Sequence, residues 1–182
     1  ALENGADQAI FAPRDLRKLD DALQLERFFL MPPQVIRQEE LERLHQWAEA
    51  HQERIFGTYI TNIGQLNFSW PGTRLAGFSM NIANNRALAE LNPAEYAPSV
   101  ELTARQIGQL GGAKELVVYG RLPLMQLRHC PRRAAENLPG KHRDCRLCDV
   151  SGKGDLPCLI DRTGAAFPLL RMAYASGCVL QL

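Results

Sequence analysis

The sequence has no cysteine before residue 130 and no long apolar run. No stretch approaches the roughly 20 apolar residues that a membrane span requires, so we expect no membrane partner. The first residues include Glu3 and Asp7 and no basic start, which is not the pattern of a signal peptide. The formal net charge is only +1, so no overall field attracts nucleic acid or anionic lipid. These absences favour a globular protein of the cytoplasm.

Several short motifs of known enzyme classes are also missing. The sequence contains no GxSxG, no HExxH and no P-loop. It has no initiator Met and begins with ALENGAD, which is typical of a helix that runs into a strand. We therefore expect a piece of a longer protein, with the remaining part of that chain or a homologous subunit as a partner.

Short apolar segments alternate with polar helical segments over most of the chain. Residues 9–12 form a short apolar segment, and strands are predicted at residues 28–33, 54–62, 75–84, 96–102 and 114–120. Helices are predicted at residues 15–25, 38–52 and 85–91, and after Thr103 as N-cap. This rhythm predicts an α/β fold with a parallel sheet, as a partial or complete (β/α) TIM-type barrel over residues 1–125. A complete barrel usually needs ~250 residues, so we expect only part of one.

The composition changes after residue 125. Residues 126–158 are rich in Arg, Lys, Pro, Gly and Cys and show almost no periodicity, so a metal rather than a core can order them. Residues 157–170 predict a β-hairpin that turns at residues 162–164. Residues 126–182 are therefore predicted to be a cysteine-rich metal-binding segment with an appended β-hairpin.

The five cysteines suggest a metal site rather than a disulfide scaffold, because their number is odd and all lie after residue 129. In CRLC, two residues separate Cys145 from Cys148, so both thiolates reach one centre from a single turn. Thiolates select soft metals, and both zinc and an iron–sulfur cluster fit this spacing. A redox CxxC or inert thiols remain alternatives. His129 and His142 flank the cysteines as further candidate ligands or as solvated side chains.

Four polar residues stand near the predicted carboxyl ends of strands, where parallel α/β folds place their chemistry. They are Asn62, Asn81, Glu101 and Arg121. The two asparagines could instead form turns, and Glu101 could form a salt bridge with Arg121. Arg121 could bind a substrate carboxylate or phosphate, or support the metal site.

A basic run between residues 128 and 146 is a candidate RNA-binding segment. Its members are Arg128, Arg132, Arg133, Lys141, His142, Arg143 and Arg146. They could contact RNA phosphates, and a solvated loop is the alternative.

An ordered set of motifs resembles a known family. The set is YGRLPLM, HCP, CRLC, LIDRTGAAFP and a last Cys, and GADQAIF, FFLMPPQV, TNIGQL and FSMNIAN match it as well. Together they resemble the collagenase-like peptidase family U-thirty-two, in particular the second half of its long, two-part members. The sequence departs from that pattern because only residues 179–182 follow the last cysteine and the usual first barrel strands are absent.

The resemblance implies a (β/α) barrel and a [4Fe-4S] cluster, with zinc as the alternative that the spacing leaves open. By motif position the ligands would be Cys130, Cys145, Cys148 and Cys178. Cys158 is not carried over, and we expect it to be a small buried residue that shares a strand face with Ile160.

The resemblance also implies a function. Its better understood members support hydroxylation of RNA bases or of the ubiquinone ring, whereas the family name implies proteolysis. We expect the hydroxylation role, with a collagenase-like peptidase or a non-catalytic metal-stabilised module that binds RNA or a partner as alternatives.

Overall fold

The computed structural model describes residues 5, 8–120, 122–127, 129–137, 158–174 and 177–181, with residues 132, 173, 174 and 177–181 described at the backbone only. The chain divides into two compact units. The first contains residues 20–120 and the segment up to Ala12, and the second contains residues 13–19 and the chain from residue 121 onward. Each unit is described by itself below.

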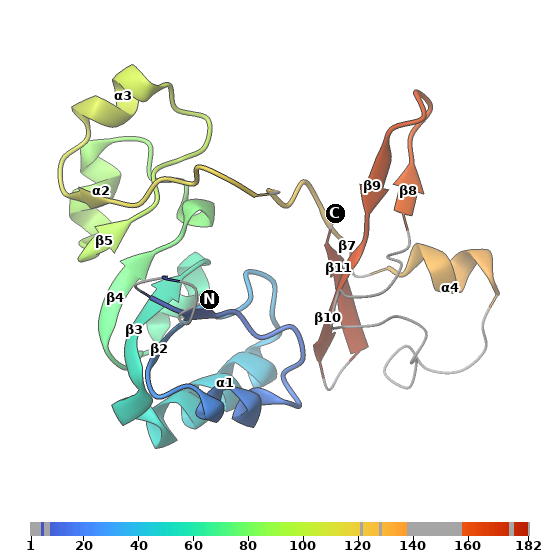
Figure 1. The fold of residues 1–182 in the computed structure, drawn as a ribbon, viewed down its shortest axis with the longest axis horizontal. Coiled ribbons are helices and arrows are strands. Elements are labelled where there is room, and N and C mark those ends of the chain that lie inside the picture. Colours follow the sequence, from blue (N-terminus) through green and yellow to red (C-terminus); the bar gives the residue numbers. More distant parts are fainter. Residues whose placement is uncertain are drawn as a thin grey trace. The chain divides into compact units, whose positions relative to one another are not determined.

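The first unit is built on a six-stranded parallel sheet whose strands follow the order of the chain (Figure 1). Consecutive strands are neighbours because each connection is short. The α/β class and the adjacent parallel strands are confirmed, whereas the described residues do not show an eight-stranded barrel. The strands are β1 (Ile10–Phe11), β2 (Phe28–Leu30), β3 (Ile55–Ile60), β4 (Thr73–Ala76), β5 (Glu95–Tyr96) and β6 (Ala113–Lys114).

Helix α1 (Gln38–Ala50) covers one face of this sheet. Leu41, Leu44 and Ala48 recur at helical spacing and are buried, which confirms the predicted amphipathic helix. The ring of Trp47 lies 6.4 Å from that of Phe28, so α1 packs on the face to which Phe28 belongs. We call this face of the sheet the helix face.

Two shorter α-helices follow later in the first unit, and both begin at capping side chains. In α2 (Asn85–Leu91), the Asn84 side chain accepts a hydrogen bond from the Ala87 amide. In α3 (Ala104–Gln109), Thr103 and Gln106 form a reciprocal capping box, which confirms the prediction of Thr103 as N-cap. Four 3-10 helices complete the unit: η2 (Leu19–Gln24), η3 (Gln52–Arg54), η4 (Ile63–Asn67) and η5 (Phe78–Met80).

The pairing register separates the side chains of the sheet into two sets. Ile60, Ala76 and Tyr96 lie on the helix face, and Ala76 and Tyr96 share a buried cluster against which Leu88 and Leu91 of α2 pack. The other face, which we call the inner face, carries a second set at alternate positions. Its central members are Phe29, Gly57, Tyr59, Leu75 and Glu95.

Gly57 shows how tightly the inner face is packed. A Cβ atom at this position would lie 2.5 Å from the backbone oxygen of Thr73 and 3.0 Å from side-chain atoms of Leu75 and Phe29. Real Cβ atoms do not approach backbone so closely, so only glycine allows β3 and β4 to pair here.

Several predicted strands are shorter in the structure. The segment 75–84 is β4 followed by η5 and a single bridge from Ile82 to Pro98, and the segment 96–102 keeps only the end of β5. The prediction of a strand over residues 114–120 is wrong, because β6 ends at Lys114. Val118 and Tyr119 beyond it are 89% and 98% exposed. Their apolar and β-branched composition indicated a strand, but a strand also needs a partner to pair with.

The predicted helix over residues 15–25 is also shorter than expected. Only η2 is helical there, and its geometry is 3-10. Ala22 is its buried residue. A short 3-10 turn needs fewer hydrogen bonds than an α-helix, which suits a segment with a single buried position.

The second unit is antiparallel. β10 (Leu170–Tyr174), β11 (Gly177–Gln181) and β7 (Gln126–Leu127) form a three-stranded sheet in that order. β8 (Cys158–Ile160) and β9 (Ala166–Pro168) form the predicted hairpin, which is confirmed, and α4 (Pro131–Ala135) follows β7. The Asp161 carboxylate accepts hydrogen bonds from the amides of Thr163 and Ala165 and fixes the hairpin turn.

Within the described ranges, no helix combines the length and the apolar character that crossing a bilayer requires.

Candidate functional site

Four residues form a row at the carboxyl ends of strands β3 to β6, and we call them the carboxyl-end row. Thr61, Gly77, Ala97 and Glu115 each follow directly after a strand. The amides of Gly77, Ala97 and Glu115 bond to carbonyls of the preceding strands at 2.8–2.9 Å, which extends the ladders by one residue. By alternation the row lies on the inner face, at the edge where parallel sheets place their functional groups.

Tyr59 reaches this row from one layer below. Its hydroxyl donates a hydrogen bond to the Glu115 carboxylate. β3 and β6 are separated by two other strands, so a flat sheet would hold their backbones roughly 14 Å apart. The contact therefore indicates that the sheet curves with its inner face on the concave side.

The environment of Tyr59 keeps its hydroxyl protonated. The residue is 2% exposed. Burial, then the hydrogen bond to Glu115, then the negative charges of Glu115 and Glu95 raise the pKa of Tyr59 above its ordinary value of 10.0. Each of these causes disfavours a second negative charge at this position. Tyr59 is therefore a fixed proton donor toward Glu115.

A buried amide holds the loop after β3 in place. Gln65 is 1% exposed, and its side-chain oxygen accepts a hydrogen bond from the Thr61 amide at 2.8 Å. Its nitrogen donates to the carbonyl of Pro33 at 3.0 Å, and the Thr61 hydroxyl donates to that of Pro32 at 2.8 Å. These bonds connect the carboxyl ends of β2 and β3, so Thr61 is rigidly positioned in the row.

The residues predicted from strand ends lie outside the row. Asn62 is the N-cap of η4, where its side chain accepts from the Gly64 amide, and Asn81 ends η5 in the left-handed conformation with φ 54°. Glu101 is exposed, so burial does not demand an ionic partner for it. In the part of the chain that the structure describes, no hydrogen bond or ion pair joins these three residues. Arg121 lies outside the described residues.

The expected strand ends differ from the observed ones by up to several residues. β3, β4, β5 and β6 end at residues 60, 76, 96 and 114, which are earlier than the sequence indicated. The sequence therefore missed Thr61 and Glu115, and also Tyr59, which lies inside a strand. The charged Glu115 directly after the two-residue strand β6 could have indicated a functional position. Its hydrogen bond with Tyr59 spans 56 residues, however, and no local sequence pattern encodes such a contact.

Cys130 is the predicted metal ligand whose side chain the structure describes. It is 8% exposed and packs with Leu169, with Leu127 and Leu159 beside them. The backbone amide of Arg133 lies 3.5 Å from its sulfur and donates to it. The sulfur is therefore enclosed by aliphatic side chains and held by one backbone N–H.

The backbone brings a second predicted ligand toward Cys130. In the antiparallel pair of β7 and β11, Leu127 lies opposite Leu180. Cys130 follows Leu127 by three residues, and Cys178 precedes Leu180 by two residues. Because the two strands run in opposite directions, both cysteines lie toward the same end of the β7–β11 pair. Residues 48 positions apart in sequence are thus carried to the same end of one ladder.

The remaining predicted ligands cannot be placed. Cys145, Cys148 and His142 lie outside the described residues, and the side chain of Cys178 is not described. His129 is exposed. Among the described side chains, no three His, Cys, Asp or Glu residues gather closely enough to hold a metal ion.

The prediction of a buried Cys158 is wrong. Cys158 and Ile160 do share one face of β8, as expected, but both are exposed. Leu159, which lies between them in the sequence and is half-buried, instead packs against the cluster around Cys130 and Leu169. A two-stranded hairpin buries only one of its faces, and apolar neighbours in the sequence do not reveal which one.

Comparisons with family models, with curated proteins and with solved structures find no match for this chain.

Proposed function

We propose that this chain is an iron–sulfur protein of the kind implied by its resemblance to the collagenase-like peptidase family U-thirty-two. Four cysteines would hold a [4Fe-4S] cluster, and the protein would support hydroxylation of RNA bases or of a small aromatic such as ubiquinone. The proposed ligands are Cys130, Cys145, Cys148 and Cys178.

The observation that carries the proposal is the position of the first and last of these cysteines. The β7–β11 ladder leads the chain to Cys130 and Cys178 at the same end, although they are far apart in sequence. The sulfur of Cys130 is buried and accepts a hydrogen bond from the backbone amide of Arg133, so it is held in a fixed position. The Cys145-x-x-Cys148 pair would supply the other two sulfurs.

A set of four thiolates fits a soft metal centre, and the proposal favours the cluster over zinc because of the family resemblance. When bound, such a cluster supplies one-electron transfer. The chain's own residues would do the rest. Tyr59 would hold its proton at the phenol oxygen beside Glu115, and Arg121 with the basic segment 128–146 would bind substrate or RNA phosphates.

We further infer that the sheet is part of a TIM-type barrel. The contact between Tyr59 and Glu115 supports this inference, because it needs a sheet that curves toward its inner face. In such a barrel the carboxyl-end row would lie at the mouth where substrates bind. Asn62, Asn81 and Glu101 would then lie in the loops above it. A reducing cytoplasm would keep the cysteines available for metal.

Purification without oxygen tests the proposal. We expect a brown protein that absorbs broadly at about 400 nm and contains about four irons and four sulfides per chain. Cys145→Ser and Cys148→Ser should each abolish the absorption, while Cys158→Ser should retain it. A colourless protein that contains one zinc per chain would exclude the cluster.

A collagenase-like peptidase is the second candidate. The observation in its favour is the buried Cys130 directly before α4. A thiol that accepts a hydrogen bond from a backbone amide can also serve as a nucleophile. Cleavage of denatured collagen that survives Cys145→Ser and is lost in Cys130→Ser would favour this function. A metal-stabilised binding module would show neither absorption at 400 nm nor cleavage, but would retain RNA in a filter-binding assay.

A further inference from the structure

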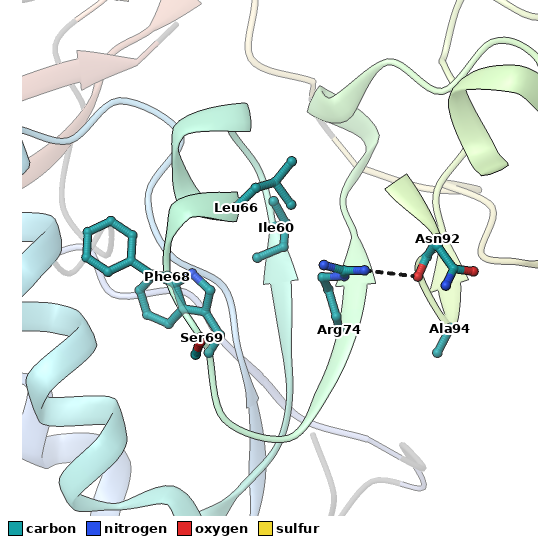
Figure 2. A pocket seen from close by; sticks show the side chains of 8 residues that line it. Ile60, Leu66, Phe68, Ser69, Arg74, Asn92 and Ala94 are labelled. Atoms are coloured by element: carbon teal, nitrogen blue, oxygen red, sulfur yellow. Dashed lines mark hydrogen bonds between the residues drawn. The ribbon is translucent and has the colours of Figure 1, made fainter. Parts of the chain in front are cut away.

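A pocket of about 430 Å³ lies on the helix face of the first unit, away from the carboxyl-end row (Figure 2). Its volume falls in the range of small-molecule sites, roughly 300–1,000 Å³. It opens beside η4, because the connection from β3 to β4 contains this five-residue 3-10 helix instead of a longer α-helix. Ile60 and Leu66 contribute apolar surface to it.

One wall of the pocket is aromatic and held in place by several contacts. Phe68 and Trp70 line it, with ring centroids 5.9 Å apart. The Trp70 indole N–H donates to the carbonyl of Gln65 at 2.8 Å. Behind them, His45 of α1 contacts both rings at 5.0–5.1 Å, and its Nε2 lies 3.1 Å from the Ser69 carbonyl oxygen. The wall is therefore preorganised rather than assembled by a ligand.

Another part of the lining carries a positive charge. Arg74 of β4 belongs to it, and Figure 2 shows its guanidinium directed toward Asn92. One guanidinium nitrogen donates to the Asn92 carbonyl at 3.3 Å, which orients the group. Among the described residues, no carboxylate lies within salt-bridge distance of Arg74. A guanidinium has five N–H donors in a planar fork, so most of them remain for a ligand.

We propose that this pocket binds a small aromatic anion, independently of the cysteine site. The flat ring of the ligand would lie against Phe68 and Trp70, and its carboxylate or phosphate would pair with Arg74. Aromatic faces favour planar partners, and the fork of an arginine matches the two oxygens of either anion. Neither the aromatic rings nor Arg74 alone gives this specificity, but both line the same pocket.

Tryptophan fluorescence tests the proposal directly, because the chain has only two tryptophans. Trp47 lies on α1 outside the pocket, so the Trp47→Phe protein reports Trp70 alone. Titration with benzoate and with phenyl phosphate should change its emission saturably, and the tighter of the two identifies the preferred anion. Benzyl alcohol and acetate, which supply the ring or the charge only, should bind at least tenfold more weakly.

Substitution of the arginine separates a built site from a surface effect. In the Trp47→Phe background, Arg74→Gln should raise the dissociation constant by roughly tenfold or more, since hydrogen bonds to charged groups are strong. Arg105→Gln is the matched control, because Arg105 is an exposed arginine of α3 outside the pocket, and it should leave binding unchanged. Absence of a saturable response to both anions, or equal affinity in the Arg74→Gln and Arg105→Gln proteins, would overturn the proposal.

Discussion

The hydroxyl of Tyr59 is the residue-scale feature that most clearly connects distant parts of the first unit. Its hydrogen bond to Glu115 joins β3 to the end of β6 across the inner face. Tyr96 provides a natural comparison, because its buried hydroxyl donates to a neutral acceptor, the Gly111 carbonyl, at 2.7 Å. The two tyrosines therefore differ mainly in the charge of the acceptor.

This difference predicts unequal costs for removing the two hydroxyls. Tyr59→Phe should lower the free energy of unfolding by about 1.5–3 kcal/mol, the range for a hydrogen bond to a charged group. Tyr96→Phe should cost only about 0.5–1.5 kcal/mol. Urea denaturation followed by circular dichroism measures both. If Tyr96→Phe costs as much as Tyr59→Phe, the carboxylate adds nothing and the proposed role of Glu115 is wrong.

The raised pKa of Tyr59 also predicts a loss of stability at high pH. In the unfolded chain the phenol ionises near its ordinary pKa of 10.0, whereas in the folded chain it stays protonated to higher pH. Stability is therefore complete below pH 10 and falls as the pH rises toward the folded pKa, by up to about 1.4 kcal/mol per pH unit. Unfolding free energies at pH 9, 10 and 11 should fall less steeply in Tyr59→Phe. Tyr119→Phe, at an exposed position, should match the wild type, and an unchanged slope in both variants would contradict the assignment.

At the scale of elements, two glycines of the sheet make opposite predictions. Gly57→Ala places a Cβ atom 2.5 Å from the Thr73 backbone oxygen, so we expect a loss of about 1–3 kcal/mol or more in unfolding free energy. At Gly77 the nearest atom to a Cβ is Thr61 Cγ2 at 3.4 Å, an ordinary contact, so Gly77→Ala should change it by less than about 0.5 kcal/mol. Thermal melting of both variants checks the pair. Equal melting temperatures would show that β3 and β4 are not as close as described.

The elements that local pattern determines were predictable from the sequence. Helices α1 and α2 and the cap at Thr103 follow from apolar spacing and from capping side chains, which are encoded within a few residues. The lengths of β4, β5 and β6 were not predictable, because strand length depends on a neighbouring strand that the local sequence does not specify. The position of Glu115 in the carboxyl-end row was missed for the same reason.

The sequence predicts a cysteine site only as a list of residues. Spacing in CRLC and the resemblance to a family indicate thiolate ligands, but they do not indicate geometry. The exposure of Cys158 shows the limit, since its apolar neighbours predicted burial and the hairpin turned its other face inward. What sequence could not supply was the β7–β11 register that leads toward Cys130 and Cys178 together.

At the scale of the whole molecule, the two units have cores of different kinds. The first unit has a sheet and three α-helices with several buried aromatic and aliphatic side chains, among them Tyr59, Phe28 and Leu44. The described core of the second unit contains Cys130 and Leu169, with two partly buried leucines beside them. Under the proposed function, a bound metal would add to the stability that this described part of the core contributes.

Loss of the metal should therefore affect the two units unequally. In Cys148→Ser, we expect metal to be absent and amide hydrogen exchange to become faster at residues 122–137 and 158–181, because the proposed metal would order these residues. Residues 20–120 should exchange at the wild-type rate, since their hydrogen bonds are protected by an independent core. Cys158→Ser is the matched control, as an exposed cysteine that is not among the proposed ligands, and it should keep both the metal and the exchange pattern. Exchange mass spectrometry of the three proteins resolves these segments. Metal loss in Cys158→Ser would move the site toward the hairpin, whereas equal acceleration in both units of Cys148→Ser would mean that the units fold as one.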